Sequence, residues 1–179
     1  NHVTISSDGG ANDFGDLSVA RFMCKGFSNQ TRGVFTGGYT TSPGQHRNII
    51  DYVTIASTGD AIDFGDVIPV SGKNYTTYGH GSSPTRGVFG GGYYAPGVDV
   101  AIIQYITLAT RGNSETFGNL NDARRDVGGL SSSTRAIFAG GTDGGDPNSN
   151  NTIDYVTIAT LGNATDFGDM AEGGRNRPG

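Results

Sequence analysis

The tripeptide Asp-Phe-Gly occurs three times in the chain, with its aromatic residue at Phe14, Phe64 and Phe167. In a protein kinase this tripeptide carries a magnesium-binding aspartate, but it occurs once there and acts with a catalytic-loop His-Arg-Asp and a strand lysine. The chain contains no His-Arg-Asp and repeats the tripeptide, which argues against kinase chemistry. We interpret each Phe as a repeated packing residue and the Gly-Asp after it as a turn.

The histidines and the cysteine offer little for metal or nucleophilic chemistry. His2, His46 and His80 stand at different places of the repeat described below, so the sequence predicts no metal cluster and no shared catalytic base. Cys24 is the single cysteine, which excludes an intrachain disulfide, and we interpret it as a small buried apolar residue.

Oxygen ligands stand at alternating positions in one loop, at Asp143, Asp146, Asn148 and Asn150. Calcium binds such ligands, but the terminal bidentate Glu of an EF-hand is missing. A polar loop is therefore the prediction, and we expect no metal site and no cofactor.

Two kinds of residue recur for reasons that we expect to be structural. Glycine runs such as residues 90–92 and 140–141 are not followed by Gly-Lys-Ser/Thr, so we predict strand ends with close backbone contact rather than a phosphate site. Arg32, Arg86 and Arg135 occupy one position in each repeat. Their expected partners are the repeated acidic residues, namely Asp51, Asp66, Asp154 and Asp169. The alternative is a ring of arginines that reads an acidic ligand.

All these residues belong to a repeated sequence. Four copies begin at Asn1, Asp51, Gln104 and Asp154, and their aromatic anchors, Phe14, Phe64, Phe117 and Phe167, lie 50, 53 and 50 residues apart. A period of that length is the signature of a solenoid or a propeller. A second element, Thr-Arg-Gly-Val-Phe in its first two copies, occurs three times, so the chain holds three full units and the end of an earlier one.

Each unit reads as four short antiparallel strands. We expect strands over residues 18–27, 32–35, 49–56 and 62–64 of the first full unit, and within residues 1–17 a strand over 3–5, a turn at Asp8-Gly9-Gly10 and a short strand around Phe14. Units of this kind are typical of propeller blades. We predict an all-β segment of one repeat domain with blades over residues 18–67, 68–119 and 120–169, the end of a preceding blade over 1–17 and the start of a further one over 170–179.

The Gly-Gly pair that closes a strand, the Tyr in the next strand, the later aromatic residue and an Arg soon after it resemble the kelch repeat, although Phe stands where a kelch unit usually has Trp. The phrases TRGVFGGG, DYVTIAT and GNATDFGD also resemble repeats in tail-fibre and other virion proteins of marine bacteriophages. These resemblances imply a kelch-like propeller and a virion or extracellular location. We expect a fragment of a longer protein, joined by further blades of the parent chain or by copies of itself.

Composition excludes several classes of partner. The chain has 31 glycines among 179 residues, only 16% charged residues and a net charge of −5, which fits a turn-rich β protein and argues against nucleic acid. No apolar run approaches the roughly 18 residues that span a bilayer, and we expect no membrane insertion.

The loops between second and third strands vary most from unit to unit, at residues 39–47, 93–100 and 142–151. In an up-and-down blade these loops emerge on the same face as the connections between blades, and function tends to lie on such loops. The predicted ligand-binding residues are Tyr39, Gln45, His46, Arg47, Tyr93, Tyr94, Asp99, Asp143, Asp146 and Asn148.

The leading hypothesis is a non-enzymatic structural or adhesive propeller of a phage tail fibre or other virion appendage, which binds a surface glycan or protein receptor. The alternatives are a kelch-type propeller enzyme, such as a copper radical oxidase, and a protein-interaction propeller.

Overall fold

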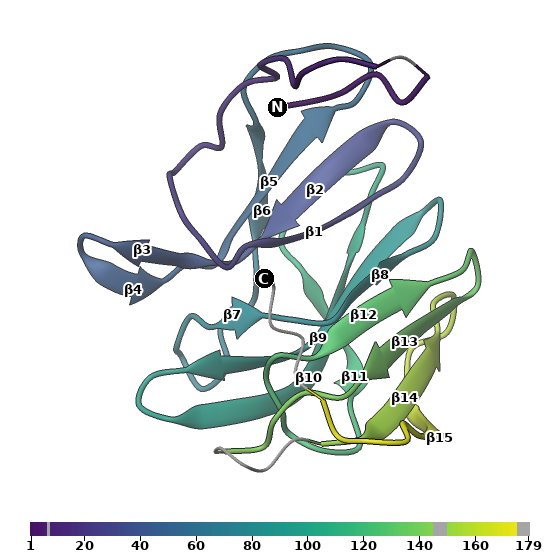
Figure 1. Cartoon of the computed structure of the whole chain (residues 1–179). Coiled ribbons are helices and arrows are strands. Elements are labelled where there is room, and N and C mark those ends of the chain that lie inside the picture. Colours follow the sequence, from purple (N-terminus) through teal and green to yellow (C-terminus); the bar gives the residue numbers. More distant parts are fainter. Residues whose placement is uncertain (7, 145–149, 175–179) are drawn as a thin grey trace.

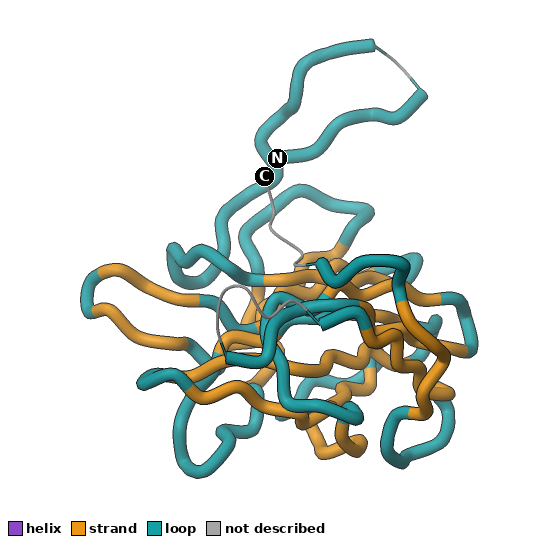
Figure 2. Tube along the Cα trace, turned by 60° about the horizontal axis from the view of Figure 1, so that its bottom comes forward, coloured by secondary structure: helices purple, strands orange, loops and turns teal. Residues whose placement is uncertain are grey.

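The computed structural model describes residues 1–6, 8–144 and 150–174, and within these residues every regular element is a β-strand. The described residues form fifteen strands, which are labelled in Figure 1, and Figure 2 shows strands and loops without a helix over the described part of the chain. The predicted all-β class is confirmed.

Three meandering antiparallel sheets follow one another along the chain. The first sheet has the order β1 (Lys25–Ser28), β2 (Arg32–Thr36), β5 (Ile49–Thr54) and β6 (Ile62–Asp66). The third sheet has the order β12 (Gly128–Ser131), β13 (Arg135–Ala139), β14 (Thr152–Thr157) and β15 (Thr165–Asp169).

The second sheet is larger because its central hairpin is extended. It contains β7 (Thr76–Thr77), β8 (His80–Ser82), β9 (Arg86–Tyr94), β10 (Val98–Thr107) and β11 (Glu115–Asn119). Both β7 and β8 pair with β9. On its other side β9 pairs with β10, and β10 pairs with β11. A separate hairpin of β3 (Tyr39–Thr41) and β4 (Gly44–His46) projects from the first sheet between β2 and β5 (Figure 1).

The turn before β2, β9 and β13, the strands that begin with the recurrent arginines, is stabilised by one side chain. Asn29 accepts hydrogen bonds from the N–H groups of Thr31 and Arg32 at 3.0 and 2.9 Å. Ser83 and Ser132 accept the equivalent bonds in the second and third sheets. Short polar side chains that bond to the backbone in this way favour turns, so the repeated Asn/Ser-x-Thr-Arg sequence sets the hairpin.

The Asp-Phe-Gly sequence forms a β-bulge inside the last strand of the sheet. Ile50 pairs with Gly65 and Asp51 with Asp63, which leaves Phe64 as the extra residue. The same shift leaves Phe117 unpaired in β11 and Phe167 unpaired in β15. The prediction that Gly-Asp turns the chain is wrong, because Gly65 and Asp66 lie within β6.

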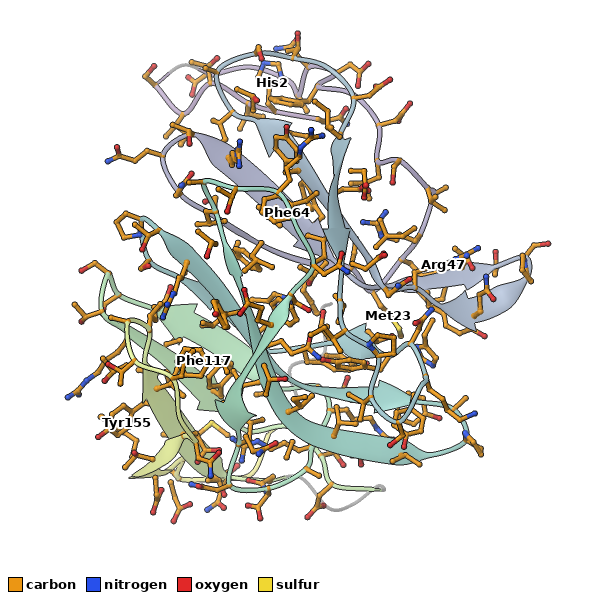
Figure 3. The ribbon with its side chains drawn as sticks, turned by 180° about the vertical axis from the view of Figure 1, so that it is seen from behind. His2, Met23, Arg47, Phe64, Phe117 and Tyr155 are labelled. Carbon is orange, nitrogen blue, oxygen red and sulfur yellow. The ribbon has the colours of Figure 1, made fainter. Side chains whose placement is uncertain are left out.

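The core lies between successive sheets. Phe64, 2% exposed, packs with Tyr52 in a cluster that continues to Leu108 of the second sheet. Phe117, 3% exposed, packs with Tyr105 in a cluster that continues to Ile158 of the third sheet. Figure 3 shows Phe64 near the boundary of the first two sheets. The prediction of a recurrent packing residue is confirmed for these two, whereas Phe167 is 58% exposed.

Each sheet is hydrogen-bonded to the next by the same three contacts, which we call a junction. The Phe64 and Asp66 carbonyls accept from Gly112 N and Ser114 N, both at 2.8 Å, and Asp66 N donates to the Asn113 side chain at 2.9 Å. Phe117 and Asn119 make the equivalent contacts with residues 162–164, and Phe14 and Asp16 with residues 59–61. Residues 1–17 therefore contact the first sheet as β6 contacts the second.

Among the described residues the recurrent arginines form no ion pair with the predicted acidic partners, and Arg32 and Arg86 act instead at the junctions. Each guanidinium stacks on a tyrosine ring, Arg32 on Tyr52, Arg86 on Tyr105 and Arg135 on Tyr155, with 4.7–4.8 Å to the ring centre. Arg32 also donates to the Leu108 carbonyl, and Arg86 donates to the carbonyls of Ile158 and Ala159 at 3.1 and 3.0 Å.

The predicted partners Asp51 and Asp154 form different ion pairs. Asp51 pairs with Arg21 at 2.8 Å and Asp154 with Arg124 at 2.9 Å, and all four side chains are fully buried. Since two buried carboxylates are thereby neutralised, the connections that carry Arg21 and Arg124 are fixed to the third strand of their sheets.

Several predicted strands differ from the structure. Residues 18–24 form no strand, and β1 begins only at Lys25, because Met23 has a backbone φ of 59°, which interrupts an extended chain. The predicted strands over residues 3–5 and around Phe14 are reduced to one bridge between His2 and Asn12. The variable loops 39–47 and 93–100 are regular hairpins, β3–β4 and the outer parts of β9 and β10.

Candidate ligand-binding pocket

A hollow of about 480 Å³ lies where the β3–β4 hairpin, the β9–β10 hairpin and the connections between sheets meet. We call it the aromatic pocket. Its lining residues are Phe22, Met23, Tyr39, His46, Thr76, Tyr78, Tyr93, Ala95, Arg125 and Asp126. Figure 3 shows Met23 near the base of the projecting hairpin, on the side of the molecule away from Tyr155.

Four rings form a continuous row in this pocket. Phe22 contacts Tyr39 edge to face with 5.5 Å between ring centres, Tyr39 contacts His46 at 5.1 Å, and His46 contacts Tyr93 at 5.7 Å. Edge-to-face contacts of this kind hold aromatic rings in fixed relative orientations. The row therefore presents a preformed apolar wall.

Charged groups lie at one end of the row. The Arg125 guanidinium stacks over the Tyr93 ring at 4.7 Å and donates to Asp99 at 3.2 Å. Burial raises the pKa of Asp99, against the opposing effect of Arg125, and the nearby Asp126 and Asp143 raise it further. The pocket thus offers a fixed guanidinium donor and carboxylate acceptors beside an aromatic surface.

His46 is held in its neutral form by its surroundings. Burial lowers the pKa of His46, and its Nδ1 lies 2.8 Å from the Thr76 hydroxyl oxygen. Burial and the neighbouring Asp126 raise the pKa of Tyr78, which keeps the phenol protonated. At neutral pH both side chains are therefore uncharged hydrogen-bonding groups.

The backbone around the pocket is regular on one side and strained on the other. Tyr39 is fixed by two backbone hydrogen bonds with Phe22, at 3.0 and 2.8 Å. Met23 and Asp126 have positive φ values of 59° and 56°, which cost on the order of 1–3 kcal/mol each in residues other than glycine. Strained residues of this kind cluster at functional sites, and both of these line the pocket.

The structure brings together four of the predicted binding residues. Tyr39, His46 and Tyr93 line the pocket, and Asp99 reaches it through Arg125. Asp143 is exposed and lies close enough to affect the pKa of Asp99.

The remaining predicted residues lie elsewhere. Gln45 lines a neighbouring hollow of about 300 Å³ and lies against the Arg47 guanidinium, whose Nε donates to Thr40. Tyr94 packs against the core between the first two sheets. Asp146 and Asn148 lie outside the described residues.

Seven pocket residues were not predicted. Thr76 belongs to β7 and Ala95 to the turn between β9 and β10, and the others come from connecting segments: Phe22, Met23, Tyr78, Arg125 and Asp126. The topology places these connections on the same face as the variable loops. The shared face could have indicated these residues from the sequence. The repeat pattern did not indicate them, because the residue types at these positions differ from unit to unit.

Residues 1–6, 8–144 and 150–174 contain no group of three His, Cys, Asp or Glu side chains placed to hold a metal ion. The three histidines lie apart: His2 contacts Phe14, His46 lies in the pocket, and His80 stacks on Phe27 and on Phe89, which also stack on each other. Asn150, one of the predicted oxygen ligands, accepts hydrogen bonds from Arg124 and from Thr152 N. Within the described chain no helix has the length and apolarity needed to cross a membrane.

Comparison with known proteins finds no family model that matches the chain and no curated protein that is significantly similar to it.

Proposed function

We propose that the chain is a segment of a non-enzymatic β-propeller that displays the aromatic pocket and binds a cell-surface carbohydrate there. The observation that carries the proposal is the row of Phe22, Tyr39, His46 and Tyr93 with the Arg125–Asp99 pair at its end.

Three sheets joined by equivalent junctions support the propeller. Each sheet has four strands in meander order, with the enlarged second sheet adding one, and residues 50 or 53 positions apart make the same contacts with the following sheet. Blades of a propeller repeat in this manner around a central axis. In this arrangement the variable hairpins and the connections lie on one face.

A sugar ring matches the chemistry of the pocket. Its C–H faces pack on aromatic rings, while its hydroxyl groups need donors and acceptors at fixed positions. Arg125 supplies a donor, Asp126 an acceptor, and neutral His46 and Tyr78 can serve as either. A guanidinium at one end also suits a carboxylate or sulfate group on an acidic sugar.

Binding to immobilised neutral and acidic oligosaccharides tests the proposal. Tyr93→Ala should abolish binding, because it removes the ring on which Arg125 stacks and which contacts His46. Arg125→Ala should weaken binding of acidic sugars more than of neutral ones. Arg111→Ala is the matched control, since Arg111 is exposed and lies outside the pocket.

Binding that all three variants retain, or the lack of any sugar that binds, would contradict the assignment of this pocket. The proposed location on a virion appendage rests on the resemblance of the repeats, and an antibody against the chain that fails to label virions would contradict it.

A further inference from the structure

At each of the three internal junctions the last segment of one unit is covered by the next unit. β15 has the same junction residues, and no described residue covers them. β15 is the last strand of the third sheet, and over residues 1–6, 8–144 and 150–174 it pairs with β14 alone. Phe167 and Asp169 stand where Phe64 and Asp66 stand in β6, so their carbonyls occupy the acceptor positions of a junction. Unpaired strand edges of this kind favour association.

Side chains and glycines at β15 confirm that the junction is open. Phe167 is 58% exposed, whereas Phe64 and Phe117 are 2% and 3% exposed. A Cβ atom at Gly65 or Gly118 would lie 2.3 or 2.1 Å from a backbone oxygen of the next sheet, but at Gly168 nothing lies within 4 Å. Among the described residues the Arg135 guanidinium, unlike that of Arg32 or Arg86, bonds to no carbonyl of a following unit.

The complementary half of a junction is open in the N-terminal segment. Gly9 and Ala11 stand where Gly112 and Ser114 donate to β6, and no hydrogen bond among the described residues uses their N–H groups. Ile5 is 98% exposed, although Ile158 at the same place of the repeat is 1% exposed between the second and third sheets. Figure 2 shows the N-terminal segment projecting from the body of the molecule.

We propose that residues 3–6 and 8–11 of a second copy of this chain dock on the β15 edge and form a fourth junction. Gly9 N and Ala11 N of one copy donate to the Phe167 and Asp169 carbonyls of the other. Ile5 packs on Phe167 and Tyr155, and its carbonyl accepts from Arg135. The geometry of this contact is taken from the internal junctions, because they contain the same residue types at the same spacing.

The docked segment differs from an internal junction in two respects. Gly10 replaces Asp60, Asn113 and Asn163, so the side-chain acceptor for Asp169 N is missing. The N-terminal segment also lacks the strands that would cover Leu130, which corresponds to Phe27 and is 70% exposed. Leu130 therefore distinguishes two kinds of partner: a complete repeat unit would cover it, whereas the N-terminal segment would leave it exposed.

The contact is head to tail, so each copy has one docking segment and one acceptor edge. Such contacts build rings when the rotation closes and filaments when it does not. Neither surface includes the aromatic pocket, and the proposal does not depend on carbohydrate binding.

Sedimentation velocity of the 179-residue chain over a wide range of concentration tests the proposal. The wild type should form species larger than a monomer. Ile5→Asp and Phe167→Asp should each lose them, and both substitutions lie at exposed positions, so circular dichroism should show an unchanged fold. Leu130→Asp is the control and should associate like the wild type.

Mixing the two monomeric variants gives the decisive result. The intact edge of the Ile5→Asp protein should bind the intact segment of the Phe167→Asp protein and restore a dimer, but nothing larger. A monomeric wild type, or association that either variant retains, overturns the proposal. Loss of association in Leu130→Asp would instead assign the edge to a complete repeat unit and overturn the assignment to residues 3–6 and 8–11.

Discussion

In the two buried ion pairs, the aspartate and the arginine occur together in the same units of the repeat. Asp51 and Asp154 begin equivalent copies, and Arg21 and Arg124 neutralise them. In the second sheet Gln104 stands at this position, and its amide bonds to the N–H and carbonyl of Ile68. The carboxylates thus occur only in the units that supply a buried arginine.

This pattern explains why the ion pairs were assigned wrongly from the sequence. Arg32, Arg86 and Arg135 occur in all three units, whereas the two buried aspartates occur in two. A partner that is present in the same two units, as Arg21 and Arg124 are, was the better candidate. The repeat pattern located the recurrent arginines, but it did not take into account that Arg21 and Arg124 occur in the same units as Asp51 and Asp154.

Phe64 and Phe167 give a matched test of packing, because they occupy one position of the repeat and differ in burial. Phe64→Ala should lower the free energy of unfolding by about 3–5 kcal/mol, the usual range for a buried Phe. Phe167→Ala should change it by only about 0.5 kcal/mol, as for an exposed residue. Urea titration measures both, at a concentration where the protein is monomeric. Equal losses would mean that Phe167 is buried in solution.

His80 predicts that acid destabilises the protein. Burial lowers the pKa of His80 to about 3, assisted by the charge of Lys25, and the ring stacks on Phe27 and Phe89. In the unfolded chain a histidine has a pKa of about 6.5. Between these values only the unfolded state binds the proton, so stability falls as pH decreases.

The slope should approach 1.4 kcal/mol per pH unit for one proton. Unfolding curves at a series of pH values from neutral to acidic measure it. His80→Leu should have a shallower dependence over this range. An unchanged slope in His80→Leu would show that other groups dominate.

At the scale of the element, the bulge that contains Phe117 depends on a glycine. A Cβ atom at Gly118 would lie 2.1 Å from the Gly162 oxygen, so the two sheets could not approach as closely. Gly118→Ala should therefore destabilise the protein by about 1–3 kcal/mol, as overpacking does.

Gly10→Ala is the control, since nothing lies within 4 Å of a Cβ atom there, and it should have little effect. Thermal unfolding compares the two variants. A Gly118→Ala protein as stable as the wild type would show that the sheets can move apart without loss.

Strands whose sequence recurs in every unit were predicted from the sequence, whereas segments that differ between units were not. The strands around Arg32, Tyr52 and Phe64 were located because their pattern repeats three times. The strand predicted over residues 18–27 begins only at Lys25 in the structure. In the structure Phe22 and Met23 line the aromatic pocket, and the backbone of Met23 cannot continue a strand.

At the scale of the whole molecule, the repeat predicts three similar sheets but not the site. Tyr39, His46 and Tyr93 were found because their loops vary, yet half of the pocket comes from connections whose residue types differ between units: Phe22 and Met23 occupy the same positions of the repeat as Arg125 and Asp126. Which connection residues meet is decided by the relative placement of the first and second sheets. That placement depends on side-chain packing between the sheets, which a period of about 50 residues does not specify.

The junctions also predict how local stability is distributed over the molecule. Gly112, Ser114, Gly162 and Ala164 donate hydrogen bonds between sheets that share a buried core. Their amides should exchange with solvent only when the sheets separate, and thus slowly. Gly59 and Ala61 donate the same bonds to Phe14 and Asp16, but Ile55 beside them is 46% exposed. These two amides should exchange at an intermediate rate.

Native-state hydrogen exchange followed by NMR distinguishes these classes. In dilute solution the amides of Gly9 and Ala11 should exchange almost as fast as in an unfolded chain, because no described residue accepts from them. As the protein associates, their exchange should slow toward that of Gly59 and Ala61, while the internal junctions stay unchanged. In the Phe167→Asp variant Gly9 and Ala11 should remain fast at every concentration. Rapid exchange at Gly112 and Gly162 would instead mean that the sheets separate readily, and the model of rigid junctions would fail.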